Sequence, residues 1–136
     1  MNKKCALIFF VWIMMLVMSA QLAPQEIPKE VILVLREKEI LAFSALSARW
    51  VSQDIMAREI IQHYRTASHV AIVVTNLRVL GFSAETSLWD RERFEPDEKV
   101  VSIEADGKVA SIVTNKRALA FGAPQGTWVV TRFHLK

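Results

Sequence analysis

The chain has 136 residues, of which 52% are hydrophobic and 23% are charged, and its formal net charge is +3 at pH 7. This length leaves room for one domain with one sizeable core, and the apolar content excludes a largely disordered chain.

Residues 1–19 have the order of a secretory signal peptide: a basic start, an apolar run and then small residues. The run from Cys5 to Met18 carries no charge, and it is shorter than the ~20 residues that a membrane helix needs. We therefore expect residues 1–19 to be a signal peptide, with a cut before Ala20 or before Gln21. The expected location is secreted or periplasmic, and an uncleaved membrane anchor is the alternative.

Cleavage of this leader changes the charge and the cysteine content. Lys3 and Lys4 leave with it, so 15 basic and 14 acidic residues remain and the net charge falls to +1. The basic character is then partly a property of the leader, and binding to nucleic acid is not expected. Cys5, the only cysteine, leaves as well, so the mature chain has no disulfide.

An internal repeat of constant period is the strongest pattern in the rest of the sequence. Three kinds of large apolar residue recur at one and the same spacing: Phe43, Phe82 and Phe121; Trp50, Trp89 and Trp128; Leu41, Leu80 and Leu119. Residues 20–136 number 117, which is three times 39, so the leader ends where the repeat begins. We predict one domain over residues 20–136, made of three tandem units: 20–58, 59–97 and 98–136.

Each unit has the pattern of four short antiparallel strands. In the third unit the predicted strands are Lys99–Ala105, Val109–Thr114, Ala118–Phe121 and Trp128–Phe133. Asp106-Gly107 is the expected first turn, with a positive φ at both residues. Asn115-Lys116 is the next turn, in which Asn tolerates the left-handed region. The small residues Ala42, Gly81 and Ala120 lie between the Leu and Phe positions, which predicts the close approach of a neighbouring sheet.

Two segments fit this pattern less well. Asp54–Arg65 has good helix formers behind an N-cap residue, but the repeat places Ile60–Tyr64 on a strand of the third unit, so a strand is predicted. Pro24 and Pro28 lie at the start of the first unit, where they predict an edge strand or an extended tail over Gln21–Glu30.

A 39-residue unit of four antiparallel strands that ends in a strand with Trp resembles a β-propeller blade of the WD-repeat type. The resemblance covers residues 20–136, although the Trp-Asp pair itself occurs only at Trp89-Asp90. It implies an all-β fold of propeller-like blades. Because propellers have about four to eight blades, it also implies a partner. Two chains could close a six-bladed ring as a homodimer.

A β-trefoil is the competing architecture, because it also needs three four-stranded repeats and closes by itself. Ricin-type trefoil lectins carry one Trp in each repeat, with Gln two residues earlier. This chain has Ala48, Ser87 and Gly126 at those positions, so that motif is missing.

Seven residues at repeated positions are candidate binding residues: Asn76, Arg78, Asn115, Arg117, Trp50, Trp89 and Trp128. The two arginines lie at equivalent turns and are expected to project from one rim, where they could bind an anionic group; turn formation and solubility are the alternative roles. The tryptophans could stack on sugar rings or cations, or they could form a repeated core layer.

No motif for catalysis or for metal binding occurs. There is no nucleophile elbow and no phosphate-binding glycine loop, and the three histidines have no metal-like spacing. We therefore expect a non-enzymatic protein without cofactor or metal. Its expected role is a binding or scaffold module that recognises a glycan, or an envelope or extracellular protein, through the repeated turns. The alternatives are a structural subunit that assembles into a closed ring, and a hydrolase whose catalytic residues only the fold would bring together.

Overall fold

The structure is a computed structural model and is described for residues 28–134. Over this range the chain forms eleven β-strands. None of these residues belongs to a helix that is long and apolar enough to cross a membrane. The predicted leader (residues 1–19) lies outside the described residues, as does most of the predicted edge strand or tail at Gln21–Glu30. The described residues 28–30 are not in a strand.

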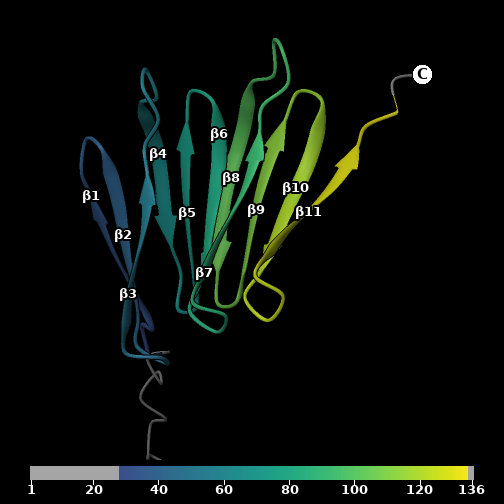
Figure 1. Cartoon of the computed structure of the whole chain (residues 1–136). Helices are drawn as coiled ribbons and strands as arrows, with labels where there is room; N and C mark the ends of the chain where they lie inside the picture. Colours follow the sequence, from purple (N-terminus) through teal and green to yellow (C-terminus); the bar gives the residue numbers. More distant parts are fainter. Residues whose placement is uncertain (1–27, 135–136) are drawn as a thin grey trace, which may run out of the picture.

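The strands form three separate antiparallel sheets (Figure 1). Sheet 1 contains β1 (Val31–Leu35), β2 (Glu39–Ser44) and β3 (Arg49–Asp54). Sheet 2 contains β4 (Ile61–Thr66), β5 (Val70–Thr75), β6 (Arg78–Ser83) and β7 (Leu88–Arg93). Sheet 3 contains β8 (Val100–Asp106), β9 (Val109–Thr114), β10 (Arg117–Gly122) and β11 (Thr127–Arg132). Each sheet is a meander in which consecutive strands are neighbours.

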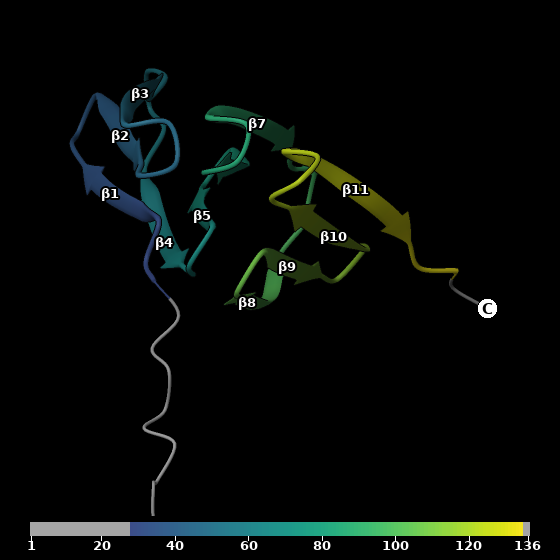
Figure 2. The same cartoon turned by 90° about the horizontal axis from the view of Figure 1, so that it is seen from below.

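The three sheets stand side by side, with sheet 2 between the other two (Figure 2). Burial along the strands follows from this arrangement. All six residues of β5 and all six of β6 are buried, because a sheet lies against each face of sheet 2. In β1 and β9, the counterparts of β5, more and less buried residues alternate, because only one face of sheets 1 and 3 is covered.

Each sheet has two different faces, which we name by their residues. The tryptophan face carries a paired Phe and Trp: Phe43 and Trp50 in sheet 1, Phe82 and Trp89 in sheet 2, and Phe121 and Trp128 in sheet 3. The small-residue face carries Ala42, Gly81 or Ala120 at its centre.

The tryptophan face of one sheet packs on the small-residue face of the sheet before it. Phe82 and Ala71 of sheet 2 form a buried cluster with Ala42 and Val31 of sheet 1. The larger cluster between sheets 2 and 3 joins residues of β5 and β6 to residues of β9 and β10; it contains Val70, Ile72, Val74, Val79, Ala110, Ile112, Leu119, Phe121 and Ala123. The core therefore consists of two layers, one at each junction between sheets.

The close approach predicted at the small residues is confirmed at the two junctions. Ala42 is fully buried in the cluster with Phe82. A Cβ added at Gly81 would lie 2.7 Å from the Phe121 ring, so only glycine leaves room for that ring. Ala120, the third member, is exposed, because no sheet covers it.

One turn prediction is wrong in its residues, and another is correct in its residues but not in its conformation. Asp106 pairs with Val109 across the hairpin, so the two-residue turn is Gly107-Lys108 and not Asp106-Gly107. Of these turn residues only Gly107 has a positive φ, of 54°, which matches the turn type that places Gly at its first central position. The predicted turn at Asn115-Lys116 does connect β9 to β10, but Asn115 does not have a positive φ.

The all-β prediction is confirmed, and the strand predicted for Ile60–Tyr64 appears as β4, one to two residues later. The trefoil alternative is wrong: a trefoil needs strands of different units to pair into one closed sheet, whereas each described strand pairs only within its own unit. In sheet 1 the described residues supply three strands rather than the four predicted for each unit.

Candidate functional site

A buried cluster of polar residues joins sheet 1 to sheet 2. The guanidinium of Arg78, at the start of β6, donates from Nε to Oε1 of Glu59 over 2.7 Å and from Nη2 to Oε2 over 3.0 Å. Thr75 donates its hydroxyl to the same carboxylate, and Arg78 Nη2 also donates to the main-chain carbonyl of Asp54, at the end of β3. Since Asp54 belongs to sheet 1, the cluster ties two sheets together.

The same cluster recurs one repeat later, between sheets 2 and 3. Arg117 donates from Nε to Oε1 of Glu98 over 2.8 Å, and Thr114 donates its hydroxyl to that oxygen. Arg117 Nη2 donates to the main-chain carbonyl of Arg93, at the end of β7. A further carboxylate, that of Glu92, accepts from Arg117 Nη1 over 2.8 Å. We call these two clusters the Glu–Arg–Thr locks.

Both glutamates of the locks remain ionised in the fold. Burial alone raises the pKa of Glu59, but the hydrogen bonds from Arg78, from the Met56 amide and from Thr75 outweigh it and hold the pKa below its usual value of 4.5. The same balance, with Arg117 in the place of Arg78, lowers the pKa of Glu98. Hydrogen bonding to Glu98 raises the pKa of Arg117 against its burial, and Glu92 adds to this.

The two turn asparagines also bind within the fold. Asn76 accepts the Ile60 amide on Oδ1 over 2.7 Å and donates from Nδ2 to the Arg58 carbonyl. Asn115 makes the equivalent pair of bonds with the Lys99 amide and the Asp97 carbonyl. Each asparagine thereby holds the chain segment that leads into the first strand of its own sheet.

The expectation that the turn arginines project from a rim is wrong. Arg78 and Arg117 are only 3% and 4% exposed, because a carboxylate and a main-chain carbonyl already bind each guanidinium. Asn76 and Asn115 are exposed, but both ends of each amide are hydrogen-bonded to the neighbouring loop. The structure thus places the two arginines in the junctions between sheets, where they bind the preceding sheet, whereas each asparagine holds a loop of its own sheet.

The three tryptophans have equivalent positions but different surroundings. Each is tilted against the Phe of its own sheet, with ring centroids 5.1–5.2 Å apart. Trp89 and Trp128 are half-buried against the preceding sheet, and Trp89 Nε1 donates to the Val51 carbonyl of sheet 1 over 3.2 Å. Trp50 is 54% exposed, because no described residue precedes sheet 1 on that side. Trp50 alone is therefore available to a ligand or partner in the manner that the sequence suggested.

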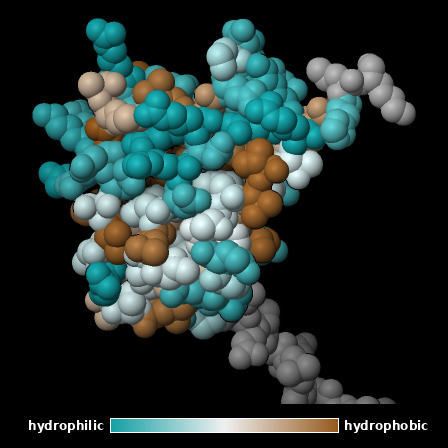
Figure 3. Space-filling view, turned by 45° about the vertical axis from the view of Figure 1, so that its right-hand side comes forward, coloured by the Kyte–Doolittle hydropathy of each residue, from teal (hydrophilic) through white to brown (hydrophobic). Residues whose placement is uncertain are grey.

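Apolar side chains are exposed on the two end faces of the array. On the tryptophan face of sheet 1, Ile32 and Val34 are 53% and 38% exposed, whereas their counterparts in sheets 2 and 3 are buried. On the small-residue face of sheet 3, Val109 and Val129 are 60% and 65% exposed. Hydrophobic patches among hydrophilic residues are visible on the side where sheet 3 lies (Figure 3).

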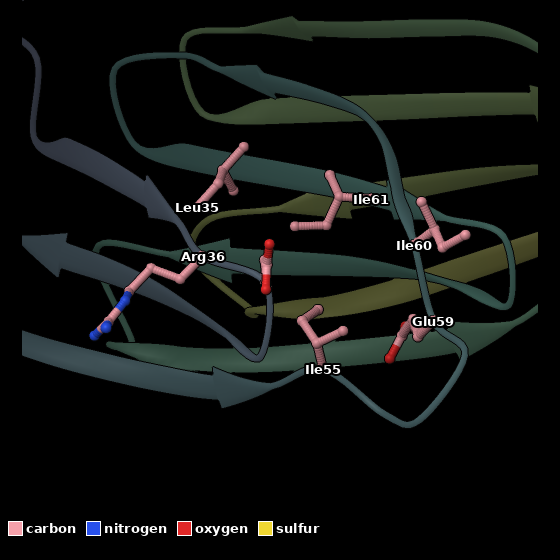
Figure 4. Close-up of a pocket in the computed structure, with 7 residues that line it drawn as sticks. Leu35, Arg36, Ile55, Glu59, Ile60 and Ile61 are labelled. Carbon is pink, nitrogen blue, oxygen red and sulfur yellow. The ribbon is translucent and has the colours of Figure 1, made fainter.

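A surface pocket of about 520 Å³ lies where sheet 1 meets sheet 2. Its apolar lining is Leu35, Ile55, Ile60 and Ile61, which gather around it, whereas the Arg36 guanidinium points away (Figure 4). In sheets 2 and 3 a first strand pairs with β5 or β9, but in the described residues no strand pairs with the outer edge of β1. The pocket lies beside the end of that open edge, and its lining combines these apolar side chains with the charged residues Arg36, Glu37 and Glu59.

The partners of the two arginines were missed in the sequence, although a signal for them was present. Glu59 and Glu98 themselves follow the repeat spacing, as do Thr75 and Thr114.

Residues 28–134 contain no group of three or more His, Cys, Asp or Glu side chains that could hold a metal ion. The exposed apolar side chains on the tryptophan face of sheet 1 and the small-residue face of sheet 3 are suited to contact with another apolar surface. Comparisons with protein-family models and with curated proteins found no match for this chain.

Proposed function

We propose that this protein is an exported, non-enzymatic structural subunit that assembles through its two exposed end faces into a larger ring of propeller-like blades. The observation that carries this is the contrast between end faces and inner faces. Apolar side chains that are buried at the two junctions have exposed repeat equivalents on the outer faces of sheets 1 and 3. Val109 of sheet 3, for example, is 60% exposed, whereas its repeat equivalents Val31 and Val70 are fully buried.

Exposed apolar faces of this kind favour a partner. A monomeric protein rarely leaves a contiguous apolar patch uncovered, and such patches mark interaction sites. Three blades are also fewer than the about four that the smallest propellers use, whereas six blades from two copies fall within the usual range. The order of basic, apolar and small residues at positions 1–19 supports export to the periplasm or the cell exterior.

The test is the absolute mass of residues 20–136 in solution, measured by light scattering after size exclusion over a wide concentration range. Assembly into a two-chain ring predicts a mass about twice that of one chain. A single-chain mass at the highest concentration reached would contradict the proposal.

Recognition of a glycan, or of an envelope or extracellular protein, is the second candidate function. The exposed indole of Trp50 favours it, because tryptophan faces stack on sugar rings. A Trp50→Phe variant provides the control in a fluorescence titration with cell-wall glycans. A change of emission that is lost in this variant would support the function, and no change with any glycan would count against it.

A further inference from the structure

The contacts between consecutive sheets repeat with the sequence. At the edge of the junctions, the Glu30 amide donates to the Ser68 carbonyl over 2.7 Å, and one repeat later the His69 amide donates to the Gly107 carbonyl over 3.0 Å. At the centre of the junctions, Phe82 packs on Ala42 and Phe121 packs on Gly81. Two junctions therefore share one set of contacts, which defines how a tryptophan face fits a small-residue face.

Moving each of these contacts along the sequence by one repeat identifies the residues that would make it at a further junction. Lys108 is the repeat equivalent of Glu30 and His69, whose amides donate at the two junctions. Lys29 is the repeat equivalent of Ser68 and Gly107, whose carbonyls accept. In the same way, Ala120 of sheet 3 corresponds to Ala42 and Gly81, and Phe43 of sheet 1 corresponds to Phe82 and Phe121. One half of a junction thus lies at each end of the three-sheet array.

We propose that a second copy of this chain covers these end faces head to tail, so that the tryptophan face of sheet 1 in one copy packs on the small-residue face of sheet 3 in the other. This inference rests on the proposed function and names its partner and its register. In this register the Lys108 amide donates to the Lys29 carbonyl, and the Phe43 ring lies over Ala120. The indole N–H is not part of this repeated set: Trp89 donates to the Val51 carbonyl at the first junction, whereas the Trp128 indole N–H has no hydrogen-bond partner among the described residues at the second.

Shape favours this pairing over a pairing of like faces. Two tryptophan faces would bring Phe43 and Trp50 against their own copies, and two small-residue faces would leave unfilled space around Ala120. Head to tail, bulky residues meet small ones, as at both inner junctions. Neither face carries a charge in its apolar centre, which is made of Ile32, Val34, Leu41, Phe43 and Trp50 on one side and Val109, Ser111, Val113, Ala118, Ala120 and Val129 on the other. A head-to-tail contact closes into a ring when the rotation allows it.

Cysteine cross-linking tests the register directly, because residues 20–136 contain no cysteine. A backbone hydrogen bond brings two residues close to the Cα spacing of about 4.4–6.8 Å that a disulfide needs. Two variants of residues 20–136, Lys29→Cys and Lys108→Cys, are prepared separately and then mixed under mild oxidation. The double variant Glu30→Cys/Ser68→Cys is the internal control, since its pair makes the equivalent bond within one chain.

We expect a covalent dimer in the mixture of the two single variants, and at least tenfold less in either variant alone. A disulfide that forms in one variant alone, with none between the two, shows that like faces meet; it overturns the register but leaves self-assembly intact. An oligomeric mass with no cross-link in the mixture overturns the register in the same way, provided that the internal control closes. A single-chain mass overturns this inference and the proposed function together.

Discussion

Arg78 and Arg117 show why a charged residue at a turn need not be a binding residue. Each guanidinium lies within the fold and is neutralised by a glutamate 19 residues earlier in the chain. Burying a charge is costly unless a partner of opposite charge and further hydrogen bonds accompany it, and both locks provide these. Removing one partner leaves the other buried and unpaired, so each lock makes the fold sensitive to single substitutions.

We expect Glu59→Gln to lower the free energy of unfolding by about 3 kcal/mol, because it leaves the Arg78 charge buried without a counter-charge. Glu39→Gln is the matched control: Glu39 pairs with Arg36 on the surface, and an exposed pair contributes roughly 0–1 kcal/mol. Urea unfolding of both variants measures the difference as a shift in midpoint at constant m-value. Equal losses in the two variants would mean that the lock is no stronger than a surface pair.

Stability should also fall in acid through the same carboxylates. The pKa values of Glu59 and Glu98 are lowered in the fold, so the stability they contribute is fully present above their usual pKa of 4.5 and is lost as the pH falls through the lowered values. Urea midpoints measured from pH 7 down to pH 3 should therefore decline most steeply below about pH 4.5. Glu98→Gln should flatten this decline, and an unchanged acid slope in that variant would contradict the assignment.

At the scale of elements, sheet 2 determines how close the other sheets can lie. Its two faces are both covered, and at its centre Gly81 admits the Phe121 ring. The backbone conformation two residues before each tryptophan is also common to the three units: Ala48, Ser87 and Gly126 all have φ between 52° and 65°. The turn between the last two strands thus keeps one backbone shape in all three units, although only the third unit has the glycine that this shape favours.

Gly81→Ala is expected to destabilise the protein by roughly 1–3 kcal/mol, because the added Cβ forces the Phe121 ring, or the whole of sheet 3, to move. The double variant Gly81→Ala/Phe121→Leu should recover part of this loss, since the smaller side chain makes room. Thermal unfolding of the single variants and the double variant gives the coupling energy. If the two effects simply add, the ring does not limit the approach of the sheets.

The contact proposed between copies lacks two features of the inner junctions. Glu39 is the repeat equivalent of Arg78 and Arg117. The contact between copies therefore has a carboxylate where each lock has its guanidinium, and the same lock cannot form there. Ser44 and Ser83 donate to carbonyls of the following sheet, whereas Gly122 at the third position has no hydroxyl. We therefore expect two copies to separate before the sheets of one chain do.

At the scale of the whole molecule, assembly should depend on the end faces alone. Trp50→Lys places a charge in the centre of one end face, so this variant should have the mass of a single chain by light scattering, with its thermal stability as a monomer little changed. Ile60→Lys is the control, because Ile60 is 65% exposed but lies in the loop before β4, away from both end faces. Loss of assembly in both variants, or in neither, would contradict the role of the end faces.

The repeat made most of the architecture predictable. Identical spacing of Phe, Trp and Leu placed three equivalent units in register, and alternation along the strands indicated which residues share a face. The same alignment gave the correct strand at β4, where local helix propensity pointed the other way, because pairing in a sheet outweighs intrinsic preference. What it could not show was that equivalent residues have different neighbours: Trp50, Trp89 and Trp128 are alike in sequence, yet only Trp50 is more than half exposed.

The sequence by itself determined the β-strand content, the three units and their common frame, since these depend on periodicity and on turn residues that act over a few positions. Only the tertiary structure decided which charged residues bind one another and which faces stay open. Arg78 and Glu59 are 19 residues apart and meet because β4, β5 and β6 pair within sheet 2, and Arg78 reaches the Asp54 carbonyl of sheet 1 only because the two sheets pack together. A contact of that kind depends on the positions of whole sheets in space, which no local pattern of residues specifies.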